Sequence, residues 1–439
     1  MISIILFALL VIAGAGLFTY NVRKISKNIK KGQPQKIDGH FGKRMKRMLS
    51  VAIGQSKMVR NPIAGILHIF VYAGFIIINI EVIEIILDGI MNEHRIFASY
   101  GGNLYNILIG AFEILAFLTI LGCAIFLIRR NIIRLRRFHL KEMTRWPRTD
   151  ANIILTTEIF LMSAFLIMNA SDSILQSRNV GHYIQAGFFP VADFLVPFFT
   201  NFSDSGLILI ERFCWWFHII GIFAFLNYLP YSKHFHILLS FPNVFYSKLE
   251  PLTSFNNLLS VTNEVKLMLD PNANPYADSG TDEIDESQKF GASDITELSW
   301  KSLMDAYSCT ECGRCSSVCP ANITGKKLSP RKIIMDTRDR IEETTGNDKP
   351  DKLLLRDYIT PEELWACTTC NACTQECPVD IDHMSVIINL RRYIVLEESA
   401  APSTLNSMFT NIENNGAPWQ YPPAERLKWA DEIYIKKLN

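Results

Sequence analysis

The chain has 439 residues, of which 49% are hydrophobic, and its 44 lysine and arginine residues almost balance its 43 acidic residues. The net charge of +1 gives no support for a nucleic-acid partner or a strongly acidic partner. The length is sufficient for two or three structural units, and the apolar residues are concentrated in the first half.

Five apolar runs in that half each approach the roughly 20 residues that a helix needs to cross a bilayer. They cover residues 2–20, 62–87, 104–128, 151–175 and 206–231. The sequence therefore predicts a five-helix transmembrane bundle within residues 1–245. A further apolar stretch at 182–200 is interrupted by Pro190 and Pro197, and we expect it to lie in the outer interface.

The basic residues predict how the bundle is oriented. Residues 21–61 contain twelve lysines and arginines and residues 129–150 contain eight, whereas the loops at 88–103 and 176–205 contain one arginine each. Because cytoplasmic loops carry the excess of basic residues, we expect the N-terminus outside and the carboxyl half in the cytoplasm. The predicted location is the cytoplasmic membrane of a bacterium or archaeon.

Four histidines lie in or beside the predicted spans: His68, His218, His234 and His236. Two imidazoles from facing helices can hold a haem iron inside a bundle. His68 and His236 both lie near cytoplasmic ends of spans, so we expect them to bind a b haem. His218 precedes His236 by roughly 27 Å of helix and is a candidate ligand of a second haem. We expect His234 to be an interfacial or capping residue, which is also the alternative for the others.

Glu113 lies near the middle of the third span, where a carboxylate is costly. It is a candidate for proton transfer. No glycine-rich dinucleotide fingerprint or phosphate-binding loop is visible in the sequence, so we expect neither a flavin nor ATP bound by those motifs.

The second half begins with a polar linker and contains two copies of one cysteine motif. The linker is predicted at 246–299, because residues 270–298 are polar and acidic. The motifs are Cys309-x-x-Cys312-x-x-Cys315-x-x-x-Cys319-Pro and Cys367-x-x-Cys370-x-x-Cys373-x-x-x-Cys377-Pro. This spacing is typical of paired 4Fe–4S clusters. We expect a cytoplasmic α-helical domain at 300–400 with the motifs on turns between helices, and hence an all-α chain.

In such pairs the cysteine before proline ligates the other cluster. One cluster is then predicted on Cys309, Cys312, Cys315 and Cys377, and the other on Cys367, Cys370, Cys373 and Cys319. Zinc is the alternative, but zinc sites use two Cys-x-x-Cys pairs without a further cysteine before proline. Disulfides are disfavoured because a cytoplasmic location keeps thiols reduced.

The segment from Phe217 to His236 resembles the last haem-bearing helix of the gamma subunit of respiratory nitrate reductase, with its two-histidine interval and its Pro230-Tyr-Ser-Lys233 turn. The run around His68 looks like that family's second helix. The resemblance implies that His68 and His236 hold the haem nearest the cytoplasm. The family's usual partner of His218 is replaced by Ile78, so a second haem requires His94 or His182 to fold back from the outer side.

The whole chain is similar to membrane Fe–S oxidoreductases related to heterodisulfide reductase, including electron-transfer-flavoprotein:menaquinone oxidoreductases. Longer members continue beyond a tryptophan-containing hinge into Cys-Cys-Gly repeats, and no such pair occurs here. The tail at 401–439 carries Trp419 and Trp429 as candidate anchors for a separate Cys-Cys-Gly-type Fe–S subunit or a flavoprotein. The alternative is a tail packed on its own domain.

These observations predict an oxidoreductase subunit that passes electrons between a cytoplasmic partner and menaquinone or another quinone in the bilayer. The expected cofactors are two 4Fe–4S clusters and a b haem. Glu113 would then exchange protons with the quinone. A heterodisulfide-reductase-type subunit and a haemless anchor that connects a partner dehydrogenase are the alternatives.

Overall fold

The computed structural model describes residues 2–37, 39–249, 254–270, 289–344 and 351–437. Within these ranges the chain is helical and forms no β-strand, which confirms the predicted all-α class. The acidic part of the predicted linker, residues 271–288, lies outside the described residues.

Five helices are long and apolar enough to cross a membrane, as predicted. They are α1 (Ile2–Ile29), α3 (Pro62–Met91), α4 (Ala98–Asn131), α5 (Arg145–Ser177) and α7 (Asp204–Tyr228). Most of them exceed their apolar runs by several residues because flanking polar residues continue the helix into the interface. Pro62 opens α3 at a position that needs no N–H donor, and the Ser203 hydroxyl accepts from Gly206 N to cap α7.

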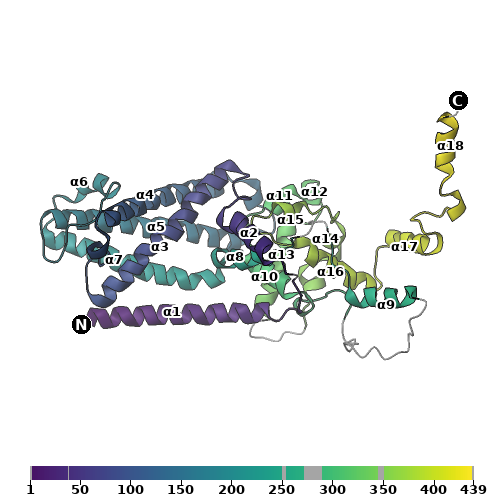
Figure 1. Cartoon of the computed structure of the whole chain (residues 1–439), viewed down its shortest axis with the longest axis horizontal. Coiled ribbons are helices and arrows are strands. Elements are labelled where there is room, and N and C mark those ends of the chain that lie inside the picture. The colour runs from purple at the N-terminus through teal and green to yellow at the C-terminus, as the bar shows by residue number, and fades with distance from the viewer. Residues whose placement is uncertain (1, 38, 250–253, 271–288, 345–350, 438–439) are drawn as a thin grey trace. The chain divides into compact units, whose positions relative to one another are not determined.

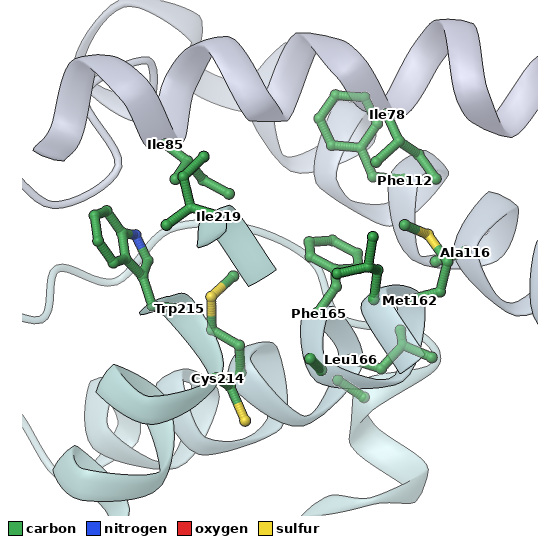
Figure 2. Close-up of a cluster of buried hydrophobic side chains, with 14 of the residues drawn as sticks. Ile78, Ile85, Phe112, Ala116, Met162, Phe165, Leu166, Cys214, Trp215 and Ile219 are labelled. Atoms are coloured by element: carbon green, nitrogen blue, oxygen red, sulfur yellow. The ribbon is translucent and has the colours of Figure 1, made fainter. Parts of the chain in front are cut away.

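The helix α5 occupies the centre of the bundle (Figure 1). It packs against both α4 and α7, while α3 packs on α4 and α1 packs on α3 and α7. Half of the apolar window of α5 is buried in the protein, compared with 11% for α1, so α1 is peripheral. Figure 2 shows the core where α3, α4, α5 and α7 meet, with Phe112, Phe165 and Trp215 among its large side chains.

The segment predicted to lie in the outer interface combines two environments. It contains the short helices η3 (Ala192–Phe194) and α6 (Val196–Phe199). Phe189 and Ala192 are buried in the bundle core, whereas Phe194 and Phe198 are more than 70% exposed. One face of the segment therefore packs into the bundle, and the other is available to lipid.

Short elements border the cytoplasmic ends of the spans. They are α2 (Phe41–Met48) and η1 (Leu49–Ile53) before α3, η2 (Arg136–Phe138) before α5, and η4 (Leu229–Tyr231), η5 (Lys233–Phe235) and α8 (His236–Phe245) after α7.

The cysteine motifs lie on turns between short helices, as expected. The first motif lies among α10 (Trp300–Ser308), α11 (Arg314–Val318) and α12 (Pro320–Ile323). The second lies between α14 (Pro361–Trp365) and α15 (Ala372–Glu376). The remaining elements of this part are η6 (Ile295–Glu297), α13 (Pro330–Glu343), η7 (Leu354–Tyr358) and the start of α16 (His383–Leu396).

The chain divides into two compact units that differ from the predicted domains. One unit comprises residues 1–255 and 294–386, so the bundle and the cysteine motifs belong together. The other comprises residues 256–293 and 387–439, with α9 (Leu259–Leu269), most of α16, α17 (Ser403–Asn415), η8 (Pro423–Glu425) and α18 (Lys428–Lys437). The tail and most of the predicted linker therefore fall in the same unit.

Candidate functional site

The two cysteine motifs fold into matching loops. Glu311 and Thr369, each two residues after the first cysteine of its motif, both have left-handed backbone angles with φ of 53° and 55°. Their N–H groups each donate to the sulfur of that first cysteine at 3.4 Å. Gly313 and Asn371 then take left-handed conformations that open α11 and α15. The repeat in the sequence is thus a repeat in the structure, with N–H donors aimed at sulfur.

The helices that follow the two loops, α11 and α15, pack against each other. Burial and the charges of Cys312 and Cys309 raise the pKa of the Cys377 thiol. In the other group, burial raises the pKa of Cys373 to about 12, with Cys367 and Cys319 as its charged neighbours. Each fourth cysteine therefore lies among the thiols of the opposite motif, which is the arrangement that crossed ligation requires.

The spacing of the thiols also bears on the zinc alternative. Among the described residues, no group of three or more His, Cys, Asp or Glu side chains is close enough to hold a single metal ion. A 4Fe–4S cube is larger than one ion and keeps its four thiolates farther apart. Two sets of separated thiols with N–H donors to sulfur therefore fit cubes better than zinc.

The first loop is attached to the cytoplasmic end of α7 through Glu311. Its buried carboxylate accepts from Lys233, and it also pairs with Arg338 at 2.6 Å. Burial alone would raise the pKa of Glu311, but Arg338 and Lys233 lower it to about 2. Lys233 lies three residues before His236, so the loop of the first motif is bonded to the turn that carries this histidine.

A second attachment joins the same loop to the segment that leads into α3. Arg314 donates to the carbonyl oxygens of Lys57 and Met58 at 3.0 and 3.3 Å. Lys57 in turn donates to the carbonyl of Cys377 at 3.1 Å and pairs with Asp380 at 2.5 Å. These contacts place cationic groups beside the predicted cluster on Cys309, Cys312, Cys315 and Cys377.

A third attachment joins α13 to the loop between α4 and α5. Arg331 is fully buried, donates to the carbonyl of Arg137 at 2.7 Å and pairs with Glu142 at 2.8 Å. Gly313 lies directly against this guanidinium, because a Cβ at that position would be 2.5 Å from Arg331 Nη1. Its φ of +72° also favours glycine.

The histidines at the cytoplasmic side converge. His236 and Arg314 are the charged groups that act on the His68 imidazole, and the ring centroids of His234 and His236 are 5.4 Å apart. Nδ1 of His236 lies 3.0 Å from the carbonyl oxygen of Lys233. If Nδ1 donates this hydrogen bond, the lone pair of Nε2 is directed elsewhere, which is the usual arrangement for a ligating histidine.

His234 belongs to the same group, contrary to our expectation of an ordinary interfacial residue. Its ring contacts Phe225 and Phe75. Burial, followed by the charges of His236 and His68, lowers its pKa to about 3. His68 Nδ1 is buried without a hydrogen-bond partner. Neutral imidazoles in an apolar setting fit haem iron, and His234 is an additional candidate ligand that the sequence interpretation missed.

The outer histidines do not approach His218. Nδ1 of His218 lies 2.9 Å from the carbonyl of Leu161. His94 Nε2 lies 3.1 Å from Asp172, eleven residues farther along α5, and the His182 ring stacks on Tyr183. His94 and His182 line an outer cavity of about 450 Å³ rich in acidic side chains. The condition that we set for a second haem is therefore not met in this structure.

Glu113 is fully buried and has three donors. Its carboxylate accepts from Val191 N at 2.9 Å, Ala192 N at 3.0 Å and Asn169 Nδ2 at 3.0 Å. Asn169 in turn accepts from Arg95, which also pairs with Asp172. The arrangement fastens the segment after Phe189 to α4 and α5. Proton transfer by Glu113 stays a prediction.

Comparisons with known proteins agree with the cysteine motifs. Residues 308–381 match the family model described as a 4Fe-4S dicluster domain. The probable iron-sulfur-binding oxidoreductase FadF of Bacillus subtilis is 29% identical over 98% of this chain and 61% of its own length. The EtfAB:quinone oxidoreductase of Syntrophomonas wolfei is 26% identical over 88% of this chain and 54% of its own. This chain is a relative of iron–sulfur oxidoreductases.

The similarity to these two relatives is not confined to the motifs, since it extends through the bundle. A shorter similarity joins the cluster region to one subunit of a CoB-CoM heterodisulfide reductase of Methanosarcina acetivorans, with 37% identity over 23% of this chain and 52% of that polypeptide. The chain spans less than two thirds of the length of each of these three relatives. No solved structure matches.

The sequence interpretation did not find the residues that join the motifs to the bundle. Lys57 and Lys233 were counted only as basic residues near the membrane surface. Glu311 and Arg314 lie inside the first motif, and the corresponding positions of the second motif are Thr369 and Ala372. This difference between the two copies was the available signal.

Proposed function

We propose that this chain is a membrane-bound electron-transfer subunit that connects a cytoplasmic redox partner to the quinone pool through two 4Fe–4S clusters and one b haem. The observation that carries the proposal is the direct bonding of one cysteine loop to the turn that carries His234 and His236. Iron–sulfur oxidoreduction by the relatives and the five membrane-capable helices support the same interpretation.

Eight cysteines would hold the two clusters, and His68 and His236 would hold the haem. When bound, these groups accept and release single electrons, while the chain sets their potential and excludes water. Lys57, Arg314 and the N–H donors to sulfur stabilise negative charge near the thiolates. The apolar surroundings of His234 and His236 keep these imidazoles neutral and available as ligands.

Quinone is proposed as the membrane substrate because a relative whose similarity extends through the bundle is named EtfAB:quinone oxidoreductase. By the same analogy, a soluble electron-transferring flavoprotein is the candidate partner. Reduction of quinone takes up two electrons and two protons, so single electrons from the chain must be accumulated at the quinone. The N-terminus would face outward and the clusters the cytoplasm.

A component of a heterodisulfide-reductase-type complex is the second candidate function, because the cluster region is similar to one polypeptide of such an enzyme. In that case the chain would pass electrons to a separate disulfide-reducing subunit docked on the tail around Trp419 and Trp429. Both tryptophans are more than half exposed. Co-purification of a second cysteine-rich subunit that is lost on deleting residues 412–439 would support this candidate.

The haem is tested by the dithionite-reduced-minus-oxidised spectrum of the protein purified in mild detergent. We expect a b-type α band in the wild type that is lost in His68→Ala and in His236→Ala. His139→Ala is the matched control, because the His139 ring bonds only to the nearby Arg130 carbonyl. Loss of the band in His234→Ala but not in His236→Ala would reassign the ligand. Absence of a band in the wild type would contradict the haem.

A further inference from the structure

The two cysteine loops differ in their exposure to solvent. In the first loop, Cys309 and Cys315 are buried, and Glu311 and Arg314 are only 3% and 5% exposed. In the second loop, Cys370 is exposed. Two loops with the same backbone conformation therefore have different surroundings.

The first loop owes its burial to the bundle. Lys233 follows α7, Lys57 and Met58 precede α3, and Arg137 lies between α4 and α5, so three separate cytoplasmic junctions contact this motif or the adjacent α13. Cys377, the predicted fourth ligand of the same cluster, is also on this side, since its carbonyl accepts from Lys57. All of these contacts place the first cluster at the membrane side.

The second loop has the opposite surroundings. Among the described residues, the side chains of Cys367 and Cys373 contact Met384 and Thr374 of the same domain. Its predicted fourth ligand, Cys319, is followed by α12, where Ile323 is 61% exposed, and by the exposed Lys326 and Lys327. An exposed face thus surrounds the second cluster, formed by Val318, Ile323, Lys326, Cys370 and Gln375.

The rate of electron transfer falls steeply with distance, so a soluble protein must bring its redox centre close to a cluster. A transient redox encounter needs only a small interface, below about 1,200 Å². The face around Cys370 is exposed, polar at its rim and next to one cluster. The loop of the first motif cannot be approached in this way, because the bundle covers it.

We propose that a one-electron redox protein docks on the face around Cys370, so that electrons enter or leave the chain at the second cluster. The first cluster, on Cys309, Cys312, Cys315 and Cys377, is then the one that exchanges electrons with the membrane. In the reducing direction the docked protein loses one electron at a time and no bond forms or breaks. This order rests on the proposed function only for the nature of the membrane acceptor.

The order is tested by the spin relaxation of the reduced clusters in the presence of a soluble dysprosium chelate, which acts through space on exposed paramagnetic centres. Two variants assign the two signals. Cys370→Ser perturbs the second cluster, and Lys57→Gln removes a positive charge beside the first cluster and lowers its midpoint potential. Lys352→Gln, at an exposed lysine paired with Glu343, is the control and shifts neither potential.

We expect the chelate to relax the signal perturbed by Cys370→Ser several-fold more than the signal shifted by Lys57→Gln. If Cys370→Ser fails to assemble, Thr368→Asp places a negative charge next to the second cluster and shifts only that signal. An equal response of the two signals, or a larger response of the Lys57-dependent one, would overturn the proposed order. The result does not depend on haem or quinone, so it is distinguishable from failure of the proposed function.

Discussion

Glu311 shows how a single residue inside a metal-binding motif can also join two parts of the chain. Its carboxylate is buried and lies between Lys233 and Arg338. Both cations are themselves largely buried, so they depend on this anion for compensation of their charge. Since the pKa of Glu311 is about 2, the carboxylate stays ionised at physiological pH.

Removal of this charge should be costly. We expect Glu311→Gln to lose about 3–5 kcal/mol of unfolding free energy, because two buried cations are left without their anion. Denaturant titration in mild detergent, followed through the cluster absorbance, measures the loss. Glu362→Gln is the control, since Glu362 forms an exposed pair with Lys327, and its loss should stay below about 1 kcal/mol. Similar losses in the two variants would show that Glu311 does not join the bundle to the cluster loop.

At the scale of elements, α4 and α5 are held together with the 189–199 segment by buried polar groups as well as by apolar packing. Glu113 accepts from two backbone N–H groups of the segment, and Arg95 connects Asn169, Tyr105 and Asp172. A buried polar network in which most members are paired specifies one arrangement of the helices. The segment after Phe189 is therefore fixed on the bundle instead of lying freely on the membrane.

The anchoring role of Glu113 can be separated from proton transfer. We expect Glu113→Ala to release the segment, because each buried N–H left without an acceptor costs about 1–3 kcal/mol, and limited proteolysis from the outer side should then cut within 189–199. Glu113→Gln keeps a carbonyl acceptor and should stay resistant. If Glu113→Gln resists proteolysis but loses quinone reduction, proton transfer is supported. If Glu113→Ala is as resistant as wild type, the anchoring role is wrong.

Close helix packing gives another prediction at this scale. A Cβ at Gly74 of α3 would lie 2.4 Å from Thr119 Oγ1 of α4, so Gly74→Ala should overpack the contact and cost about 1–3 kcal/mol. Gly16→Ala in α1 is the matched control, because no atom lies within 4 Å of its added Cβ. The control should be neutral or gain up to about 1 kcal/mol from helix propensity. Equal stability of the two variants in detergent unfolding would contradict the α3–α4 packing.

For the whole molecule, the sequence was most informative where a local pattern determines the structure. Apolar runs of bilayer length predicted α3 and α7, and the repeated cysteine spacing predicted the loops around Cys312 and Cys370. The joints between Lys57 and Asp380 or Lys233 and Glu311 could not be predicted in this way. They pair residues far apart in the chain, and nothing local distinguishes these lysines from their many basic neighbours.

Two other features escaped prediction for related reasons. His234 was interpreted by its neighbour Lys233, whereas the short helices η4 and η5 turn its ring inward, toward Phe75 and Phe225. The shared unit of 256–293 and 387–439 could not be predicted from composition, which made the first segment look like a linker and the second like a tail. In both cases the tertiary arrangement decides the outcome.

Passage of electrons between the clusters and quinone by way of His68 and His236 is tested most directly by reducing the protein anaerobically in liposomes and adding a menaquinone analogue. The cluster signals are then followed by freeze-quench electron paramagnetic resonance. We predict rapid reoxidation of both clusters in the wild type and in His139→Ala, and much slower reoxidation in His68→Ala with its clusters intact. Clusters that stay reduced in the wild type, or that reoxidise equally fast in His68→Ala, would contradict this electron path.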